Sequence, residues 1–488
     1  MKAGGSRDPA AAIILSGNRR VRAENMIHEY KNNGYNIVLD VNSGAVHVTD
    51  EIVYDLIPLM ERNINASDVE LAGLLSGRYR VEEVHEAAQE IRQLKEEGSL
   101  YTPDTFEQYV QSFTKGKVEH PVVKALCLHI AHDCNLRCRY CFAEEGEYHG
   151  RRALMSYEVG CRALDFLIEH SGGRKNLEVD FFGGEPTMNF EVVKQLVEYG
   201  RKREKETDKH FRFTLTTNGV LLNDEILDFA NKEMHNLVLS IDGRREINDR
   251  MRPTASGSGS YDIILPKFKK AAESRNQTNY YVRGTYTHYN TDFAADVLHL
   301  HDEGFEQISV EPVVCDPKED YALKEEDLPV LLEQYDILAR EIIKRRKEGR
   351  FINFFHFMID LEGGPCVAKR LSGCGAGCEY LAVTPWGDLY PCHQFVGEEK
   401  FLLGNVYDGI VDKDIPKKFG EANVYTKPEC KKCFAKFYCS GGCMANSYHA
   451  SGNINGNYAI GCELQRKRIE CAIMIKAALA EEGEESDA

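Results

Sequence analysis

The sequence predicts an α/β fold built around a partial barrel of parallel strands, and two observations lead to this prediction. Apolar strand-like runs alternate with helical patterns over residues 124–314. The 16 cysteines are absent from the first 126 residues and concentrate in short stretches further along. The alternation is typical of a parallel sheet with crossover helices. The clustered cysteines indicate metal ligation in a separate, cysteine-rich region.

Composition limits the classes of protein to which the chain can belong. It has 488 residues, 43% hydrophobic and 28% charged, which suits a globular protein of several domains. No apolar run approaches the roughly 18 residues of a membrane span, and no secretory signal is evident, so we expect a cytoplasmic protein without a membrane partner. A net charge of −17 argues against nucleic acid as a partner.

The N-terminal part predicts a small module over residues 26–104. Residues 1–25 lack periodicity and are interpreted as an extension that need not be native, with Met26 an alternative start. Strand-like alternation over 35–50 surrounds an Asn42-Ser43-Gly44 turn, which predicts a hairpin. Helical patterns follow at 51–62, 67–75 and 81–97, and Ser67 is a candidate N-cap.

The central part, residues 118–318, predicts the barrel. Its six strand-like runs are ALCLHIA, LEVDFFG, FRFTLTT, LVLSI, YVRGTYT and QISVEPV. Helical patterns lie between them, among others at 159–170, 190–205 and 261–274. Six β–α steps predict a (β/α)6 partial barrel, whose site we expect at the carboxyl ends of the strands.

Three further segments complete the predicted organisation. Residues 319–365 form a charged helical connector, residues 366–470 a cysteine-rich domain, and residues 471–488 a C-terminal helix with an acidic tail. The stretch from Cys366 to Cys471 holds ten of the 16 cysteines. Its apolar core is thin, so we expect it to fold around metal.

The first cysteine motif follows the first barrel strand. Cys134, Cys138 and Cys141 are spaced as C-x3-C-x2-C. Three thiolates on a 4Fe–4S cluster leave one iron free for a further ligand. The alternative is a structural zinc site, which needs four ligands and could recruit His132.

Polar and glycine residues end the next three strands. These are Gly183-Gly184-Glu185-Pro186, Thr216-Thr217-Asn218-Gly219 and Ser240-Ile241-Asp242-Gly243. Each segment alone is also what a simple turn requires. Arg252, Arg250 and Arg283 are basic residues of the same region.

In these motifs and their order, residues 120–315 resemble the radical S-adenosylmethionine (SAM) superfamily. The resemblance implies that the Cys134 motif holds a 4Fe–4S cluster to which SAM binds. It also implies that the Gly-Gly-Glu segment contacts the SAM amino group and that Ser240 and Arg252 help to hold SAM, with Arg250 the alternative and Arg283 a weaker candidate. The expected SAM-binding residues are Tyr140, Gly183, Gly184, Glu185, Thr217, Asn218, Ser240, Asp242 and Arg252.

The C-terminal cysteines form a second, longer motif. Cys374 and Cys392 flank Gly387, then follow Cys430-x2-Cys433-x5-Cys439-x3-Cys443 and Cys462. A zinc ribbon over 430–462 is the alternative. The block resembles the SPASM domain of radical SAM peptide maturases, which implies two auxiliary clusters and three 4Fe–4S clusters in all. By that resemblance Cys430, Cys433, Cys439 and Cys462 hold one cluster and Cys374, Cys392 and Cys443 the other, with Cys378 an open candidate for its fourth ligand.

The remaining cysteines lack metal-ligand spacing, and we expect them to be buried apolar residues. They are Cys127, Cys161, Cys315, Cys366 and Cys471.

The hairpin followed by helices resembles the winged-helix-like recognition element of enzymes that modify ribosomally synthesised peptides (RiPPs). A leader peptide would add a strand to the edge of the hairpin. A purely structural module is the alternative. Together the three parts resemble the maturases of SCIFF peptides (six cysteines in forty-five residues), so the implied partner is a cysteine-rich precursor peptide with a leader.

The resemblance implies reductive SAM cleavage, hydrogen abstraction from a peptide carbon and closure of a cysteine sulfur onto that carbon. An electron donor such as ferredoxin or flavodoxin is implied. His393 follows Cys392, where anaerobic sulfatase maturases carry an acidic residue, and is the candidate base. The alternatives are a sulfatase maturase, a peptide epimerase, a carbon–carbon cross-linking maturase, and a zinc-stabilised peptide-binding scaffold without catalysis.

Overall fold

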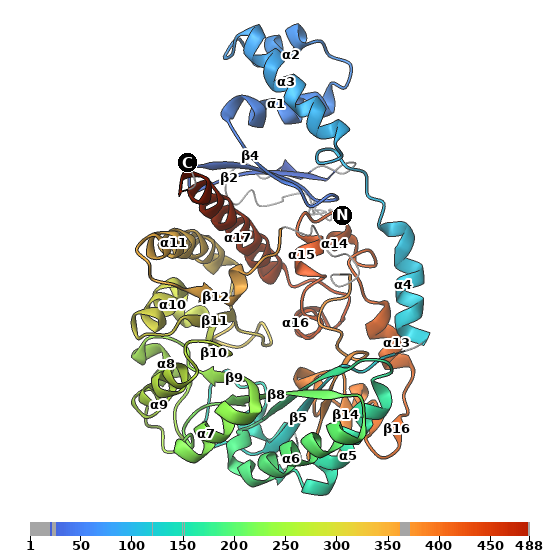
Figure 1. Ribbon diagram of the computed structural model, residues 1–488, viewed down its shortest axis with the longest axis vertical. Helices are drawn as coiled ribbons and strands as arrows, with labels where there is room; N and C mark the ends of the chain where they lie inside the picture. The colour runs from blue at the N-terminus through green and yellow to red at the C-terminus, as the bar shows by residue number, and fades with distance from the viewer. Residues whose placement is uncertain are drawn as a thin grey trace, which may run out of the picture.

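The computed structural model describes residues 20–21, 26–119, 121–148, 150, 152–361 and 371–486. Most of the predicted extension 1–25 and Cys366 therefore lie outside the described residues. Figure 1 shows a small N-terminal module at one end of the molecule and the barrel strands with their helices at the other. The C-terminal helix α17 (Ala459–Ser486) runs between them.

The barrel strands agree with the prediction in place and direction. They are β5 (Ala125–His132), β7 (Asn176–Gly183), β8 (His210–Thr217), β9 (Met234–Ser240), β10 (Tyr280–Tyr286) and β11 (Gln307–Pro312). Each pairs in parallel with the next in chain order. A short strand β12 (Asn353–Phe354), which was not predicted, continues the parallel sheet beside β11, and β6 (Ala153–Leu154) pairs antiparallel with β5.

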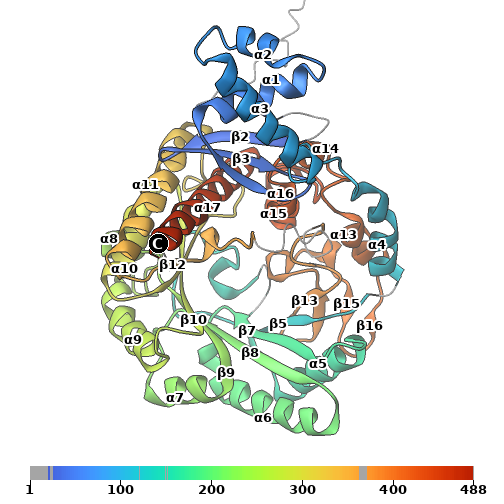
Figure 2. The same cartoon turned by 45° about the horizontal axis from the view of Figure 1, so that its top comes forward.

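Helices follow the strands and cover the outside of the sheet, as Figure 2 shows. They are α5 (Tyr157–His170), α6 (Phe190–Glu206), α7 (Asp224–Glu233), α8 (Arg245–Met251), α9 (Tyr261–Ser274), α10 (Phe293–Asp302) and α11 (Leu328–Lys347). Ser156 caps α5 by accepting a hydrogen bond from Val159 N. The predicted helices at 159–170, 190–205 and 261–274 are thereby confirmed.

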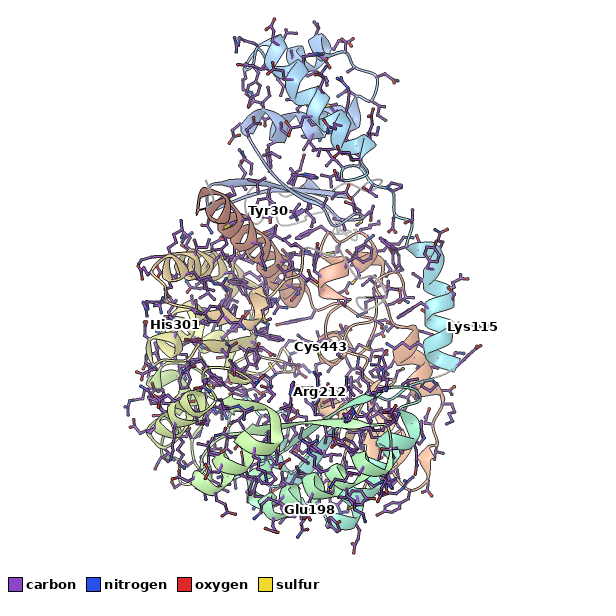
Figure 3. All side chains as sticks on the ribbon, in the orientation of Figure 1. Tyr30, Lys115, Glu198, Arg212, His301 and Cys443 are labelled. Carbon is purple, nitrogen blue, oxygen red and sulfur yellow. The ribbon has the colours of Figure 1, made fainter. Side chains whose placement is uncertain are left out.

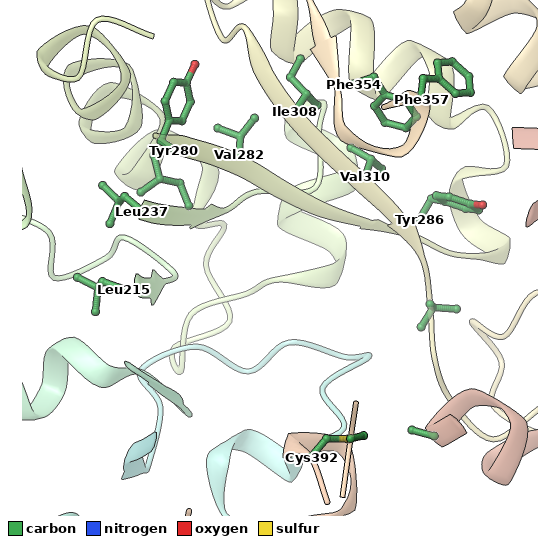
Figure 4. Packing of buried hydrophobic residues seen from close by; sticks show 14 of the residues in the cluster. Leu215, Leu237, Tyr280, Val282, Tyr286, Ile308, Val310, Phe354, Phe357 and Cys392 are labelled. Carbon is green, nitrogen blue, oxygen red and sulfur yellow. The ribbon is translucent and has the colours of Figure 1, made fainter. Parts of the chain in front are cut away.

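Alternate residues of β7, β8 and β10 are buried, which is the source of the period that their sequences display, whereas every residue of β5 is buried. Figure 4 shows part of this core, where Val282 of β10 and Val310 of β11 pack near Phe354 and Phe357. The sheet therefore has an apolar layer behind it, and the polar residues gather at the strand ends.

The N-terminal module contains the predicted hairpin, but its sheet is larger than the sequence indicated. The order is β1 (Arg20–Val21), β2 (Ile27–Asn32), β3 (Tyr35–Asp40) and β4 (Val46–Thr49), all antiparallel. Helices α1 (Glu51–Arg62), α2 (Asp68–Leu74) and α3 (Val81–Glu96) follow, and Ser67 with Glu70 forms a capping box. Strand β2 was missed because its pattern mixes charged and apolar residues.

Both faces of this sheet are covered. Val38 faces a core shared with α1–α3, whereas Ile37 and Leu39 belong to the main core of the molecule. On β2, His28 Nε2 lies 3.0 Å from a carboxylate oxygen of Glu470 in α17, and Tyr30 donates to the Glu470 carbonyl at 3.0 Å. Figure 3 shows Tyr30 at this junction. The module is thus docked on α17 through buried polar contacts.

A helix that was not predicted, α4 (Glu107–Glu119), leads from the module to the barrel. Just before it, Asp104 accepts hydrogen bonds from Tyr425 at 2.9 Å and from the buried Lys436 at 2.7 Å. The end of the module is thereby tied to the cysteine-rich region.

The C-terminal region extends the barrel sheet across the predicted domain boundary. Strand β13 (Tyr380–Val383) pairs in parallel with β5, and β14 (Asp388–Tyr390), β15 (Gly404–Asn405) and β16 (Gly409–Ile410) follow antiparallel. Gly387 makes the β13–β14 turn with φ +90°, and a Cβ there would lie 2.9 Å from Val406. Short helices complete the region: α13 (Asp414–Glu421), α14 (Pro428–Lys431), α15 (Lys436–Cys439) and α16 (Met444–Ser451).

Across the part of the chain that the structure describes, no helix combines the length and the apolar character that a membrane crossing requires.

Candidate active site and cysteine clusters

A cavity of about 170 Å³ lies at the carboxyl ends of the barrel strands, where the sequence predicted a site. Eleven of the predicted residues line it: Cys134, Cys138, Tyr140, Cys141, Gly183, Gly184, Glu185, Thr217, Asn218, Ser240 and Arg252. The fold thus brings together side chains from four successive strand ends. Predicted Asp242 lies behind the lining and contacts Tyr140.

The loop that carries the first three cysteines is held by the chain around Arg252. Arg137 N donates to the Pro253 carbonyl at 2.8 Å, and Arg139 N donates to the Met251 carbonyl at 2.9 Å. Because these backbone bonds flank Arg252 on both sides, they fix its side chain next to the cysteine loop.

Arg252, Tyr140 and Asp242 form one buried polar group. Arg252 donates to the Tyr140 hydroxyl at 2.8 Å, and that hydroxyl donates to Asp242 at 2.7 Å. Burial raises the pKa of Asp242 to about 6, although Arg252 opposes the shift. Arg252 is 7% exposed, and its Nε has no hydrogen-bond partner among the described residues. A buried donor without a partner at a cavity is what an anionic ligand would satisfy.

Arg250, the alternative to Arg252, does not take part in this group. It is exposed, and its guanidinium lies 3.6 Å from the ring centroid of Tyr289. The two arginines therefore differ in burial and in their partners. The distance of each from Ser240 along the sequence does not reveal this difference.

The Gly183-Gly184-Glu185 segment packs tightly against the cysteine loop. A Cβ at Gly184 would lie 2.1 Å from the carbonyl oxygen of Asp133, so any other residue would push the two segments apart. Glu185 is fully buried and accepts hydrogen bonds from the Thr187 and Thr217 hydroxyls at 2.5 and 2.8 Å. Its carboxylate therefore joins two strand ends.

Asn218 extends this network to the cysteines. Its side-chain amide donates to Asn135 Oδ1 at 2.8 Å and contacts the Cys134 sulfur at 3.6 Å. Its backbone N–H donates to Glu185 at 2.7 Å. The buried Nδ2 of Asn135 has no partner within the described chain, so a second donor beside the cavity is unsatisfied.

The thiols of Cys134, Cys138 and Cys141 border the cavity and do not converge on one point. Burial raises the pKa of Cys134 and of Cys138 to about 12, so as free thiols they keep their protons at neutral pH. Within the described ranges, no three His, Cys, Asp or Glu side chains converge closely enough for one metal ion. The three cysteines instead share the lining of the cavity.

Sequence reasoning missed an ion pair in the same cavity. Arg283 of β10, a weaker candidate, donates to Glu311 of β11 at 3.1 Å. Burial alone would raise the pKa of Glu311, but Arg283 and His356 hold it at about 2. Glu311, Thr285 and Gln394 line the cavity without having been predicted. The only indication of Glu311 in the sequence is the alternation of apolar and polar residues along β10 and β11.

Four C-terminal cysteines lie near enough for their thiols to influence one another's pKa. Burial raises the pKa of Cys439 to about 12, and the neighbouring thiols of Cys433, Cys462 and Cys430 raise it further. The pKa of Cys430 is likewise raised to about 11 by burial, with contributions from Cys462 and Cys433. We refer to Cys430, Cys433, Cys439 and Cys462 as the quartet.

Three other cysteines form a separate group, which we call the second trio: Cys374, Cys392 and Cys443. Burial raises the pKa of Cys392, and the adjacent thiols of Cys443 and Cys374 contribute. Glu311 of the cavity is among the charges that raise the pKa of Cys443. Figure 3 places Cys443 between the C-terminal region and the barrel. One member of the second trio is thus electrostatically coupled to a residue of the cavity lining.

Cys378 has other neighbours. Its thiol donates to the Pro416 carbonyl at 3.0 Å and lies 3.1 Å from where a Cβ of Gly420 would be. Burial raises its pKa to about 11, and the charged groups that modify it are Lys117 and Glu379. No cysteine belongs to that set.

His393 lies inside the molecule, not on its surface. Its Nδ1 is 3.0 Å from the Tyr380 hydroxyl, and its ring packs against Phe142 and Phe182. Both phenylalanines line the cavity, as does the following residue, Gln394. His393 thus stands one side chain behind the lining.

The remaining cysteines are less uniform than predicted. Cys127 and Cys471 are fully buried, but Cys161 and Cys315 are partly exposed. Cys161 lies in the outer helix α5, where only one face is covered.

Comparison with known proteins finds a family model that matches the central part of the chain. Residues 128–288 match the model of the Radical SAM superfamily. The cysteine-type anaerobic sulfatase-maturating enzyme of Clostridium novyi (strain NT) is 23% identical over 333 residues, which are 64% of this chain and 86% of that protein. The mycofactocin maturase MftC of Mycobacterium ulcerans (strain Agy99) is 26% identical over 346 residues, which are 69% and 88%.

The crystal structure of Streptococcus suis SuiB bound to S-adenosylmethionine is similar in fold. It aligns with a TM-score of 0.51 at 16% identity and covers 90% of this chain and 99% of SuiB. At this identity the likeness concerns the fold alone. The structural alignment covers 90% of this chain, whereas the two sequence relatives cover 64% and 69% of it.

Proposed function

We propose that this chain, whose residues 128–288 belong to the radical SAM superfamily, is a maturase that installs a thioether cross-link in a ribosomally made, cysteine-rich peptide. One observation carries the proposal. Three thiols and a buried arginine, whose Nε has no hydrogen-bond partner among the described residues, line a cavity at the barrel mouth, and Cys443 of a second set of three thiols is electrostatically coupled to Glu311 of that lining.

Cys134, Cys138 and Cys141 would hold a 4Fe–4S cluster with one iron left for SAM. Arg252 Nε and Asn135 Nδ2 have no hydrogen-bond partner among the described residues. Both would donate hydrogen bonds to the SAM carboxylate. When bound, SAM and its cluster would supply the radical that removes a hydrogen atom from a peptide carbon. The chain's own part is to hold the reactants and to keep water out.

The arrangement suits a cluster better than zinc. Tetrahedral zinc draws its ligands to about 2.3 Å from one ion, so the thiols must converge on a point. These thiols border a cavity of about 170 Å³ instead. Their raised pKa also means that they become thiolates only when metal takes the place of the protons.

The quartet and the second trio would hold the two auxiliary clusters. Four thiols satisfy a cubane, whereas three leave a position at which a substrate thiol would be held as its thiolate. Forming the thioether removes one hydrogen atom from the peptide carbon and one proton from the thiol. The remaining electron would pass to the auxiliary cluster and then to an external carrier such as ferredoxin or flavodoxin.

Residues 26–104 would bind the leader of the precursor peptide. Strand β4 pairs only with β3 among the described residues, and Val48 on it is 45% exposed. An open strand edge of this kind accepts an extended peptide. The docking of β2 on α17 would hold the leader at a fixed distance from the cavity.

Formylglycine formation in a sulfatase is the second candidate, because a sulfatase-maturating enzyme is among the relatives. His393 stands where those enzymes carry an acid, and burial lowers its pKa to about 4, so it is a neutral imidazole at pH 7. Its position behind Phe142 and Phe182 favours a supporting role over direct proton transfer.

The test uses the reconstituted protein under anaerobic conditions with SAM, a reductant and the cysteine-rich peptide encoded beside its gene. The proposal predicts a peptide that has lost a pair of hydrogen atoms and resists alkylation at one cysteine. A sulfatase-derived peptide converted to an aldehyde, with the cysteine-rich peptide unchanged, would instead support formylglycine chemistry.

A further inference from the structure

A second and larger hollow lies beside β12, the short strand next to β11. It measures about 720 Å³ and lies between residues 351–360, the end of α11 and one face of α17. Phe351, Phe355 and Met358 on its rim are 48, 47 and 60% exposed. We call it the lateral groove. Exposed aromatic and thioether side chains of this kind are typical of surfaces that bind another chain.

The groove carries three cations without carboxylate partners. Arg346, Arg468 and Lys476 line it, and among the described residues none of them forms an ion pair. Arg346 donates to the Ile352 carbonyl at 3.3 Å, and its Nε is buried without a partner. Asp360 is the one acidic residue of the lining and has interactions of its own. In a chain of net charge −17, this is a locally basic surface.

The inner end of the groove reaches the cavity through a line of polar side chains. Arg468 contacts His356 Nδ1 at 2.8 Å, and His356 Nε2 lies 3.9 Å from Glu311. Glu311 in turn lines the cavity together with Arg283. A molecule in the groove would therefore end one side chain away from the candidate active site.

Helix α17 joins the groove to the N-terminal module. Its residues from Gln465 to Leu479 line the groove, whereas Glu470 and Cys471 on another face contact β2 of the module. Those fourteen helical steps span about 21 Å, which an extended chain covers with about six residues.

We propose that the lateral groove holds an extended, acidic segment of the substrate peptide, about six residues long, that lies between the leader and the residue that reacts. The inference rests on the proposed function for its peptide substrate and adds the chemistry of one part of it. The apolar rim would take alternate side chains of the segment, and the three cations would pair with its carboxylates.

The test measures binding alone, with two labelled hexapeptides as probes: (Leu-Glu)3 and its neutral counterpart (Leu-Gln)3. Fluorescence anisotropy with the reconstituted full chain should show about tenfold tighter binding of (Leu-Glu)3. The double variant Arg346→Gln, Lys476→Gln should lose most of that preference, because only Arg468 remains. Lys476 is exposed, so Lys476→Gln alone keeps the test valid if the double variant is unstable, with about half of the effect on a logarithmic scale.

The matched control is Lys202→Gln, Lys232→Gln, which changes the net charge equally on exposed parts of α6 and α7. It should retain the full preference. Equal binding of the two probes, or an equal loss in control and groove variants, would overturn the proposal. A groove that is filled by another segment of this chain would also show equal binding of the two probes.

Failure of the proposed function gives a different result. If the chain does not cleave SAM but still prefers (Leu-Glu)3 through Arg346 and Lys476, the reaction is refuted and the groove stands. If SAM is cleaved and the preference is absent, the groove is refuted and the reaction stands.

Discussion

The two best-defined sets of cysteines in this protein differ in what surrounds their sulfur atoms. Cys134, Cys138 and Cys141 border a cavity that the buried Arg252 also lines, and neither Arg252 Nε nor the nearby Asn135 Nδ2 has a hydrogen-bond partner among the described residues. The four thiols of the quartet influence one another's pKa. A buried lysine, Lys427, lies near them. The difference teaches that the first set borders a cavity lined by other polar groups, whereas the thiols of the quartet have one another and a buried lysine as neighbours.

The largest effect should come from removing the first set. Replacing Cys134, Cys138 and Cys141 together by Ala should lower the iron content of the reconstituted protein from about twelve to about eight per chain. The quartet comes from another segment of the chain, residues 430–462, so iron bound there should remain. Iron and sulfide analysis checks the count, and an unchanged value would break the comparison.

The next effect concerns the cavity's guanidinium. Arg252→Gln should weaken SAM binding by about thirtyfold or more, because a buried charged donor that pairs with the ligand would be lost. Equilibrium dialysis with radiolabelled SAM measures the dissociation constant. Arg250→Gln is the matched control, two residues away and exposed, and should bind SAM as the wild type does. Similar losses in both variants would contradict the assignment of Arg252.

A smaller effect should distinguish two buried lysines near the quartet. Lys427 is 2% exposed and donates to the Gly441 carbonyl at 3.0 Å, with no carboxylate partner among the described residues. Lys436 is equally buried but pairs with Asp104 at 2.7 Å. The charge of Lys427 would therefore be balanced by the metal-bound thiolates of the quartet.

Lys427→Met should shift the reduction potential of an auxiliary cluster to more negative values, because a nearby positive charge favours the reduced state. Lys436→Met should lower thermal stability by leaving Asp104 unpaired, without that shift. A redox titration followed by electron paramagnetic resonance measures both variants. The same shift in both would show that the effect is structural.

The smallest effect should follow Cys378→Ala. The thiol bonds to Pro416, so its loss should cost about 1 kcal/mol of stability. Iron content should stay at the wild-type value if the second trio is complete without it. Loss of about four irons in this variant would identify Cys378 as a ligand and would make the second trio a closed site like the quartet.

The barrel could be predicted from the sequence because its strands are local patterns with a fixed period. Runs such as 211–217 and 237–241 are apolar on one face whatever lies next to them. Strand β2 was missed because its pattern mixes charged and apolar residues, and β13 was missed because its pairing depends on a distant partner. β13 pairs with β5, and its short YLAV run gives no indication of which edge it will join.

The same distinction applies to the candidate site. Turn residues predicted the strand ends that line the cavity, and the cysteines of the first motif share that lining. Spacing did not separate Arg252 from Arg250, and it did not reveal Glu311, whose partner Arg283 lies on the neighbouring strand. Burial and pairing across strands decide these cases, and both arise only when the chain is folded.

The account depends most on the claim that the cysteines of the barrel cavity activate SAM. Liquid chromatography and mass spectrometry of 5′-deoxyadenosine, formed from SAM by the reduced and reconstituted protein, tests it most directly. We predict that the wild type produces 5′-deoxyadenosine and that the variant lacking Cys134, Cys138 and Cys141 produces none. Equal amounts from both proteins, or none from a wild type that retains zinc in place of iron, would contradict the claim.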